Sequence, residues 1–207
     1  MNAPNVIIQR KEWINNLPKL DKNKFVFLDE SGVNIDMTKI YGRSFGGSRC
    51  VDKAPLIKPQ STTILSSVRL NGETAFKTYQ GGTACERFTD YLKNVLAPTL
   101  EPDDIVVMDN MRTHHSKAVK KVIDKLKINV IYLPPYSPDF NPIENMWSKI
   151  KAILQKLKVR VLSELSSAIE LAFSLVFLSD CLVFCGWLVR IFLWNAINFE
   201  IPSNDVK

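Results

Sequence analysis

Two short apolar runs, each ending in an aspartate, constrain the fold of this chain more than any other feature. Residues 24–29 read KFVFLD and residues 104–109 read DIVVMD. A continuous run of four apolar residues predicts a strand that is buried on both faces of a sheet. Such strands are typical of parallel pairing, in which helices cover the sheet on both sides. The sequence therefore predicts a layered sheet protein with Asp29 and Asp109 at the ends of strands.

The other patterned segments indicate that this sheet is mixed. Residues 62–69 and 74–79 have strand patterns, and Asn71-Gly72 between them is a strong signal for a tight hairpin turn. Helical or strand spacing then follows at 86–95, 115–126 and 129–133. Because the early strands follow one another and the later ones alternate with helices, we expect an α/β fold. Its sheet should have an antiparallel hairpin half and a parallel half, flanked by helices.

The remaining segments suggest how the chain is divided. Residues 1–24 are polar and are interpreted as a linker, and residues 30–60 predict a long irregular stretch or a short hairpin. The proline-rich residues 133–142 (LPPYSPDFNP) predict a rigid loop, after which a helix should run from Pro142 to about Leu157. We expect the main domain at 25–160, its C-terminal helix at 161–180 and an atypical apolar tail at 181–207.

The charge distribution favours a polyanionic partner. The chain has a formal net charge of +6, and residues 1–160 carry 25 basic and 16 acidic residues. Nucleic acid is the leading candidate, although a well-solvated surface explains the charge equally well. The four cysteines (Cys50, Cys85, Cys181 and Cys185) have no metal-ligand spacing and are interpreted as reduced. With no signal-peptide pattern at the N-terminus, we expect a cytoplasmic protein.

Three carboxylates together predict a metal site. Each of Asp29 and Asp109 could simply be a turn residue after a strand, and Glu144 could cap a helix that starts at Asn141-Pro142. Two strand-end acids and one acid on the first turn of a later helix can nevertheless converge on one point. Three hard oxygen ligands suit Mg²⁺ or Mn²⁺, and a pair of such ions supports phosphodiester chemistry.

Several motifs resemble the mariner superfamily of DDE transposases, and most closely its bacterial insertion-sequence branch. They are FLDES at 27–31, YGRS at 41–44, VVMDN at 106–110 with His114, and LPPYSPDFNPIENMW at 133–147. Within this resemblance 34 residues separate Asp109 from Glu144, as in one branch of the superfamily. The resemblance covers roughly residues 7–176.

The resemblance implies a ribonuclease-H-like catalytic domain in which Asp29, Asp109 and Glu144 hold two Mg²⁺ or Mn²⁺ ions. It implies cut-and-paste transposition: water hydrolyses a strand at the element's end, and the freed 3′-hydroxyl attacks target DNA. The implied partners are element-end and target DNA and, in the active form, a second copy of the chain. The implied location is the bacterial cytoplasm, at the nucleoid. A catalytically idle DNA-binding remnant remains the alternative, and a ribonuclease H is a weaker one.

Supporting residues follow from the same resemblance and from charge. Asn110 and His114 match a family pattern beside the second acid, which implies positioning or DNA contact; turn structure and a surface histidine are the alternatives. Arg43 and Arg49 in the glycine-rich segment are candidate DNA contacts. The lysines around the helix of Glu144 (Lys149, Lys151, Lys156 and Lys158) could bind phosphates or form a solvated face. Trp147 is expected in the core, and Glu30 and Asp139 are expected to be loop residues.

The chain departs from the family in two places. Relatives carry helix-turn-helix units before the catalytic domain, so we expect an upstream reading frame to supply that part, or else a truncated copy. At the other end, residues 171–194 are almost entirely apolar, but Asp180 and Arg190 interrupt them, which argues against a membrane span. We interpret the tail after Asp180 as an out-of-frame or decayed ending that exposes apolar surface.

Overall fold

The computed structural model describes residues 4–39, 41–53, 55, 61–82, 84–184 and 186. Its centre is a five-stranded sheet with the strand order β3-β2-β1-β4-β5. The strands are β1 (Phe25–Val33), β2 (Thr62–Arg69), β3 (Thr74–Gln80), β4 (Ile105–Met108) and β5 (Asn129–Tyr132). β1, β2 and β3 pair antiparallel, whereas β4 pairs parallel with both β1 and β5. The predicted mixed sheet, with its antiparallel and parallel halves, is confirmed.

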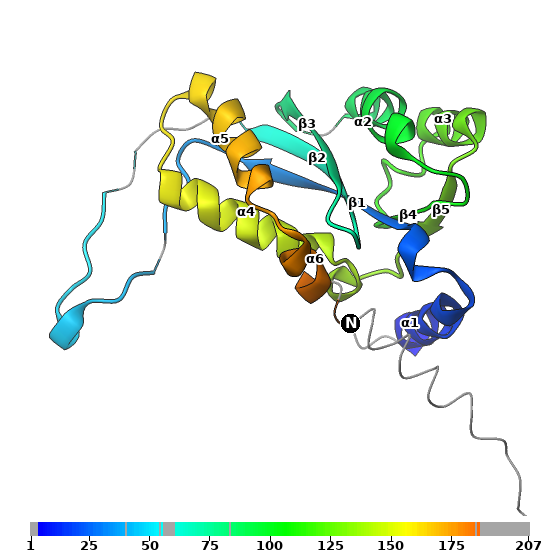
Figure 1. Ribbon diagram of the computed structural model, residues 1–207, viewed down its shortest axis with the longest axis horizontal. Helices are drawn as coiled ribbons and strands as arrows, with labels where there is room; N and C mark the ends of the chain where they lie inside the picture. Colours follow the sequence, from blue (N-terminus) through cyan, green and yellow to red (C-terminus); the bar gives the residue numbers. More distant parts are fainter. Residues whose placement is uncertain are drawn as a thin grey trace, which may run out of the picture.

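Helices cover both faces of this sheet. They are α1 (Pro4–Asn16), α2 (Cys85–Tyr91), α3 (Lys117–Leu126), α4 (Ile143–Leu157), α5 (Leu162–Ser174) and α6 (Leu178–Phe184). A π-helical turn at Leu92–Leu96 continues α2. Figure 1 shows α4 and α5 on one side of the sheet and α2 and α3 on the other. The arrangement is the three-layered one that buried parallel strands require.

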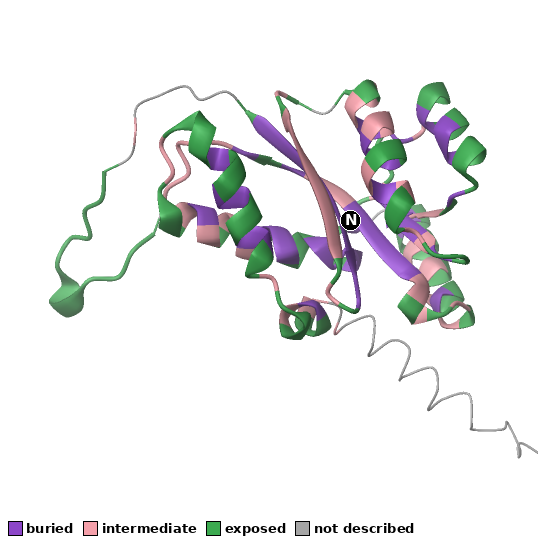
Figure 2. Ribbon diagram, turned by 45° about the horizontal axis from the view of Figure 1, so that its top comes forward, coloured by how far each residue is buried: buried purple, intermediate pink, exposed green. Residues whose placement is uncertain are grey.

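Alternating side chains of the central strands supply two separate cores. On β1, Phe25 and Phe27 belong to the cluster under α4 and α5, whereas Val26 and Leu28 belong to the cluster under α2 and α3. Successive residues of a strand point to opposite faces, so one apolar run can fill both cores. Figure 2 shows the buried residues concentrated along the central strands and on the inner sides of the helices. This explains why the run at 25–28 has no polar residue.

The hairpin turn forms where the dipeptide Asn71-Gly72 predicted it. Gly72 has a φ of 91°, a conformation that glycine adopts without steric cost. Its backbone N–H donates to the carbonyl of Arg69 at 3.1 Å, and the Asn71 side chain accepts from the N–H of Glu73 at 3.0 Å. Local sequence therefore determines the register of β2 and β3.

β1 is longer than the apolar run predicted. It continues through Glu30 to Val33, so Asp29 lies inside the strand and the expectation that the strand ends there is wrong. The extension forms because residues 30–33 pair antiparallel with the start of β2, from Leu65 back to Thr62. The same pairing places Glu30 in the sheet and not in a loop. After β1, the described part of residues 34–61 contains a single 3₁₀ turn, Phe45–Gly47, and no second hairpin.

Part of the segment interpreted as a linker is a helix. α1 occupies Pro4–Asn16 and is attached to the domain through Trp13, which stacks on Phe140. Only Val6 is fully buried within α1, because the helix has no continuous apolar face. Its contacts with the rest of the protein are made by a few long side chains, which sequence periodicity does not detect.

The predicted C-terminal helix at 161–180 is two helices, α5 and α6, bent by 80° at the break. Asp180 lies in the first turn of the second helix: its carboxylate accepts from the backbone N–H of Phe177 at 2.8 Å and forms an ion pair with Lys149 of α4. Cys181 is completely buried in the core under α4 and α5. The tail is thus part of the fold as far as α6. The rest of the predicted tail, residue 185 and residues 187–207, lies outside the described residues.

No single helix in the described residues is long and apolar enough to cross a membrane. α5 and α6 together have the necessary length and composition, but only as the bent pair described above. The inner side of α5 is used in the core, where Leu165, Ile169 and Ala172 are buried.

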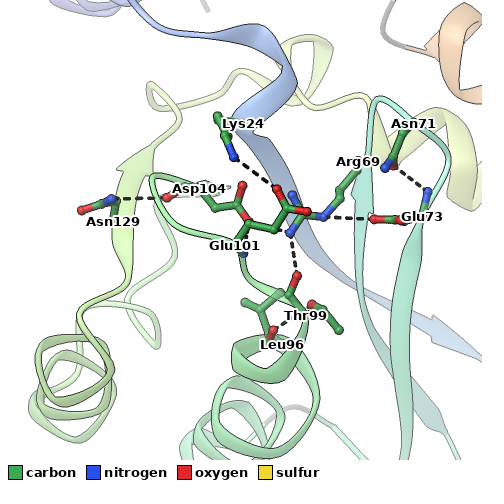
Figure 3. A network of polar contacts seen from close by, with 9 residues as sticks. All are labelled: Lys24, Arg69, Asn71, Glu73, Leu96, Thr99, Glu101, Asp104 and Asn129. Carbon is green, nitrogen blue, oxygen red and sulfur yellow. Dashed lines mark hydrogen bonds and ion pairs between the residues drawn. The ribbon is translucent and has the colours of Figure 1, made fainter.

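A buried ion pair holds the sheet together at the end where β4 starts. Arg69, the last residue of β2, donates to Asp104 at 2.6 Å and to the carbonyl of Thr99 at 2.7 Å. Asp104 also accepts from the backbone N–H of Glu101 at 2.6 Å. Figure 3 shows this network, which joins the hairpin to the segment that leads into β4. Because Asp104 precedes β4 and Asp109 follows it, the network supports the opposite end of the strand from the candidate site.

Candidate active site

The register of two parallel strands brings Asp29 and Asp109 together. β1 and β4 pair in parallel from Phe25 opposite Ile105 to Leu28 opposite Met108. Asp29 and Asp109 directly follow the last parallel pair, Leu28 and Met108, so the two aspartates lie side by side. Residues at the carboxyl ends of adjacent parallel strands meet at one edge of the sheet, where ligand sites form. Asp29 occupies this position even though β1 itself continues, because its parallel partner has ended.

The third acid comes from the first turn of α4. Glu144 lines the same cleft as Asp29 and Asp109, which has a volume of about 420 Å³. The proline-rich segment predicted as a rigid loop forms the remaining wall, with Leu133, Pro134, Pro135, Tyr136, Ser137, Pro138 and Asn141. Three side chains separated by up to 115 positions in sequence therefore face one cleft. This convergence is what the sequence pattern predicted.

Helix capping does not account for Glu144. Its backbone N–H donates to the carbonyl of Asn141 at 3.1 Å, but no side chain caps the start of α4. Within the described residues, Oδ1 of Asn141 is buried without a hydrogen-bond partner. The Glu144 side chain is exposed to the cleft. The capping-box alternative is therefore not realised, and the carboxylate of Glu144 is left available for a ligand.

Burial and negative charge make the cleft favourable for a cation. The pKa of Asp29 is raised to about 7, chiefly by burial, and the charges of Glu144 and Asp109 raise it further. Two hydrogen bonds act in the opposite direction, one from a backbone N–H and one from the indole of Trp147. Carboxylates that face one another without a positive partner resist ionisation. A divalent cation would reverse this effect by stabilising the charged forms.

The donor set fits magnesium or manganese better than a closed metal cage. No three acidic, histidine or cysteine side chains within the described ranges stand close enough to hold one ion by themselves. Mg²⁺ is usually bound through one or two carboxylates, with water and substrate phosphate completing its octahedral coordination. An open cleft lined by Asp29, Asp109 and Glu144 provides that kind of partial coordination.

Asp109 is held in place by His114. Nδ1 of His114 lies 2.7 Å from Oδ1 of Asp109, and the N–H of Met111 donates to the same oxygen at 3.3 Å. His114 is 1% exposed and stacks on Phe88. Burial lowers the pKa of His114, but its hydrogen bond to Asp109 and the charge of that carboxylate outweigh burial, so the pKa is raised overall. The alternative of a surface histidine is therefore wrong, and the contact with Asp109 gives His114 the geometry of a positioning residue.

Trp147 has a role beyond the core position that was expected. It is buried, and its indole Nε1 donates a hydrogen bond to Oδ2 of Asp29 at 3.1 Å. Trp147 follows Glu144 by three residues on α4, so both side chains leave nearly the same side of the helix. The spacing was visible in the sequence, but the partner of the indole nitrogen was not.

The other predicted contact residues are dispersed. Asn110 is exposed and lines the cleft, where its side chain contacts His115. Arg43 and Arg49 are exposed on the long segment between β1 and β2, which Figure 1 shows extending away from the sheet. Neither arginine lines the cleft.

The lysines on α4 and just after it also differ from one another. Lys149 pairs with Asp180 and lies 5.1 Å from the ring centre of Phe177. Lys158 pairs with Asp52 at 2.8 Å. Within the described residues, Lys151 and Lys156 have no ion pair, so they are the α4 lysines whose charge is available to a phosphate.

Comparison with known proteins assigns the sequence to a family. The sequence pattern of the family described as DDE superfamily endonuclease matches residues 24–166, more than two thirds of the chain. The chain belongs to the DDE superfamily endonucleases. The match includes all three carboxylates of this DDE endonuclease and ends within α5. It does not include α1 or α6.

Solved structures of the Mos1 transposase have a similar fold. The Mos1 transposase paired-end complex with left transposon end has a TM-score of 0.75 at 17% identity, covering 93% of this chain and 62% of that one. The Mos1 strand transfer complex has a TM-score of 0.73 at 15% identity, covering 99% and 64%. The Mos1 catalytic domain solved with raltegravir and Mg has a TM-score of 0.69 at 15% identity, covering 99% and 100%. No curated protein sequence matches this chain.

The ribonuclease-H-like fold expected from the sequence is thereby confirmed. This DDE endonuclease spans about 62–64% of the Mos1 chains in the DNA complexes but the whole length of the isolated Mos1 catalytic domain. The similarity is thus to the catalytic part of that transposase.

Proposed function

We propose that this chain is the catalytic domain of a transposase of the mariner superfamily, in its bacterial insertion-sequence branch. In this proposal it cleaves DNA strands at the element's ends and joins them to target DNA. Asp29, Asp109 and Glu144 are the ligands of two Mg²⁺ or Mn²⁺ ions. The observation that carries the proposal is the convergence of these three carboxylates, from β1, β4 and α4, on one open cleft.

The chemistry follows from the donor set. Divalent ions held by Asp29, Asp109 and Glu144 would supply the Lewis acidity that activates an attacking oxygen and stabilises a leaving oxygen of a phosphodiester. Asp29 and Asp109 stand on rigid neighbouring strands, so their separation is set by the sheet. Trp147 and His114 hold the carboxylates in orientation. Glu144 comes from the first turn of α4 and lines the same open cleft, which would receive the DNA strand.

Electrostatics and the relatives support DNA as the substrate. Residues 1–160 carry an excess of nine positive charges, which favours a polyanion. Mos1 was solved with transposon-end DNA, and also with Mn and with Mg. By analogy, we propose element-end and target DNA as partners, a homodimer as the active form and a helix-turn-helix part supplied by an upstream reading frame. The proposed place of action is the bacterial cytoplasm, at the nucleoid.

A strand-transfer assay tests the proposal. The purified chain is incubated with Mn²⁺ or Mg²⁺, target DNA and a pre-nicked duplex that carries the repeat flanking its coding sequence. We expect joined products that require the metal and disappear with Asp109→Asn. Joined products that persist in Asp109→Asn would overturn the metal-site assignment. No transfer, even with the DNA-binding part added, would favour the idle DNA-binding remnant.

A further inference from the structure

Arg10 of α1 forms hydrogen bonds with residues 136–139, which belong to the loop that forms one wall of the carboxylate cleft. Its guanidinium donates to both carboxylate oxygens of Asp139, at 2.9 and 2.5 Å, and to Oγ of Ser137 at 2.7 Å. A contact at 3.5 Å reaches the carbonyl of Tyr136. A planar guanidinium that makes two parallel bonds to a carboxylate fixes orientation as well as distance. These contacts join residues that are 126–129 positions apart.

Phe140 receives two further contacts from α1. Trp13 stacks on its ring with the ring centres 5.3 Å apart and the planes 10° from parallel. The guanidinium carbon of Arg10 lies 4.0 Å from the centre of the same ring. Arg10 and Trp13 are three residues apart, so they leave the same side of the helix. α1 therefore holds both ends of residues 136–140.

The loop held in this way leads directly into Glu144. Tyr136 has a φ of 56°, in the left-handed region that is uncommon for residues with a side chain. Ser137, Phe140 and Asn141 are all less than 10% exposed. The carbonyl of Asn141 then accepts from the N–H of Glu144, which starts α4. A displacement of residues 136–140 would thus be transmitted to the Glu144 carboxylate.

We propose that α1 is a positioning element of the active site, with Arg10 and Trp13 acting through residues 136–140 on Glu144. The inference rests on the proposed function of the carboxylate cleft. It assigns a role to a helix that lies before the residues matched by the family pattern. It also explains the conformation of a loop that contains no metal ligand. Neither Arg10 nor Trp13 is among the residues that line the carboxylate cleft, so their proposed effect is on its geometry.

The test compares Arg10→Gln with Lys11→Gln in the full chain. Lys11 is an exposed neighbour on the same helix, and its replacement removes the same charge. Three quantities are measured: Mn²⁺ affinity by electron paramagnetic resonance, hydrogen exchange of residues 134–145, and strand-transfer rate. For Arg10→Gln we expect faster exchange in this loop, with Mn²⁺ affinity and rate each lowered about 10-fold, as for outer residues that orient metal ligands. Lys11→Gln should match the wild type.

A charge-swapped variant, Arg10→Glu with Asp139→Arg, provides the rescue. It should recover Mn²⁺ affinity relative to Arg10→Glu alone, and it keeps the test decisive if Arg10→Gln folds poorly. Equal Mn²⁺ affinity in Arg10→Gln and Lys11→Gln would overturn the proposal, even if exchange in the loop became faster. If the wild type binds Mn²⁺ but joins no DNA, the proposed function fails while the affinity comparison still decides the role of α1. A wild type that binds no Mn²⁺ would refute both.

Discussion

The indole nitrogen of Trp147 lies 3.1 Å from Oδ2 of Asp29 and donates a hydrogen bond to it across 118 positions of sequence. The bond joins α4 to the central strand β1 inside the domain. One helix therefore contributes Glu144 to the cleft from its first turn and orients Asp29 from its second. A hydrogen bond to a carboxylate favours the charged form, which is the form that binds a metal ion.

Replacing Trp147 by Phe should weaken the metal site more than it weakens the fold. The ring contact with Phe173 is largely kept, but the bond to Asp29 is lost. We expect Mn²⁺ affinity to fall about 10-fold and the free energy of unfolding to fall by about 1–2 kcal/mol. Calorimetric Mn²⁺ titration and urea unfolding measure the two effects. Phe173→Leu is the control, since it disturbs the same packing and keeps the indole; an equal loss of affinity there would refute the explanation.

His114→Phe should separate positioning from DNA contact. The new ring can still stack on Phe88, but nothing replaces the bond to Asp109. Because His114 is 1% exposed, DNA affinity should stay unchanged while the strand-transfer rate falls about 10–100-fold. Fluorescence anisotropy with labelled DNA measures affinity, and a single-turnover assay measures the rate. A parallel fall in DNA affinity would show that His114 contacts DNA after all.

Glu144→Gln should remove the stabilisation by metal without harming the metal-free protein. The side chain is exposed and makes no cap, and its charge opposes ionisation of Asp29. Wild-type protein at 100 times the dissociation constant for Mn²⁺ should gain about 2.7 kcal/mol of stability. In Glu144→Gln most of this gain should disappear. The control is Glu164→Gln, which changes an exposed acid in the first turn of α5. Thermal unfolding with and without Mn²⁺ measures the gain in each variant. An equal gain in Glu144→Gln and Glu164→Gln would contradict the assignment of Glu144 as a metal ligand.

Asp104→Asn should destabilise the sheet and change its response to acid. The side chains of Arg69 and Asp104 are 9% and 1% exposed. Removing the Asp104 carboxylate leaves the buried guanidinium with only the 3.6 Å ion pair to the exposed Glu73, and we expect the free energy of unfolding to fall by about 3 kcal/mol. Burial tends to raise the pKa of Asp104, but the bonds from Arg69 and the N–H of Glu101 outweigh it and lower the pKa.

The sign of the pH effect follows from that lowered pKa. The contribution of Asp104 is fully present above the ordinary aspartate value of about 3.9 and is lost as the pH falls through its lower folded value. Below about pH 4, the free energy of unfolding of the wild type should therefore fall as Asp104 becomes protonated. Asp104→Asn lacks this carboxylate at every pH, so its stability should not show that part of the fall. Urea unfolding between pH 3 and pH 7 measures this. Asp103→Asn, next to it and exposed, should leave the acid response unchanged; if it does not, the effect is not specific to the Arg69 pair.

Lys149 and Lys151 should differ in their effect on DNA binding. Lys149 forms an ion pair with Asp180 and lies over the ring of Phe177, whereas Lys151 has no ion pair in the described part of the chain. Lys151→Gln should weaken DNA binding and reduce the slope of log affinity against log salt by about 1. Lys149→Gln should leave that slope unchanged and lower stability by up to about 1 kcal/mol. Salt titrations of DNA affinity measure the slopes, and equal slopes for both variants would contradict the assignment.

Local patterns predicted the elements of this fold, and the motifs predicted which three acids would come together. The apolar run before Asp109, the turn at Asn71-Gly72 and the helix after the proline-rich loop all form as expected. Each depends on neighbouring residues: apolar periodicity, a glycine with positive φ and a proline at a helix start. The extent of β1 was predicted too short, because pairing with β2 decides where a strand ends and polar residues can occupy a paired strand.

The sequence by itself predicted that Asp29, Asp109 and Glu144 would come together, because the motifs that contain them are recognisable without knowledge of their surroundings, and the three line one cleft. Only the tertiary structure decided how that site is supported. The partners of Asp29, Asp109 and Asp139 are Trp147, His114 and Arg10, and two of these pairs join residues more than 100 positions apart. A long-range hydrogen bond depends on the direction of a side chain after the layers have packed, and no short sequence window contains that direction. For the same reason a segment interpreted as a linker contains a helix that contacts one wall of the carboxylate cleft.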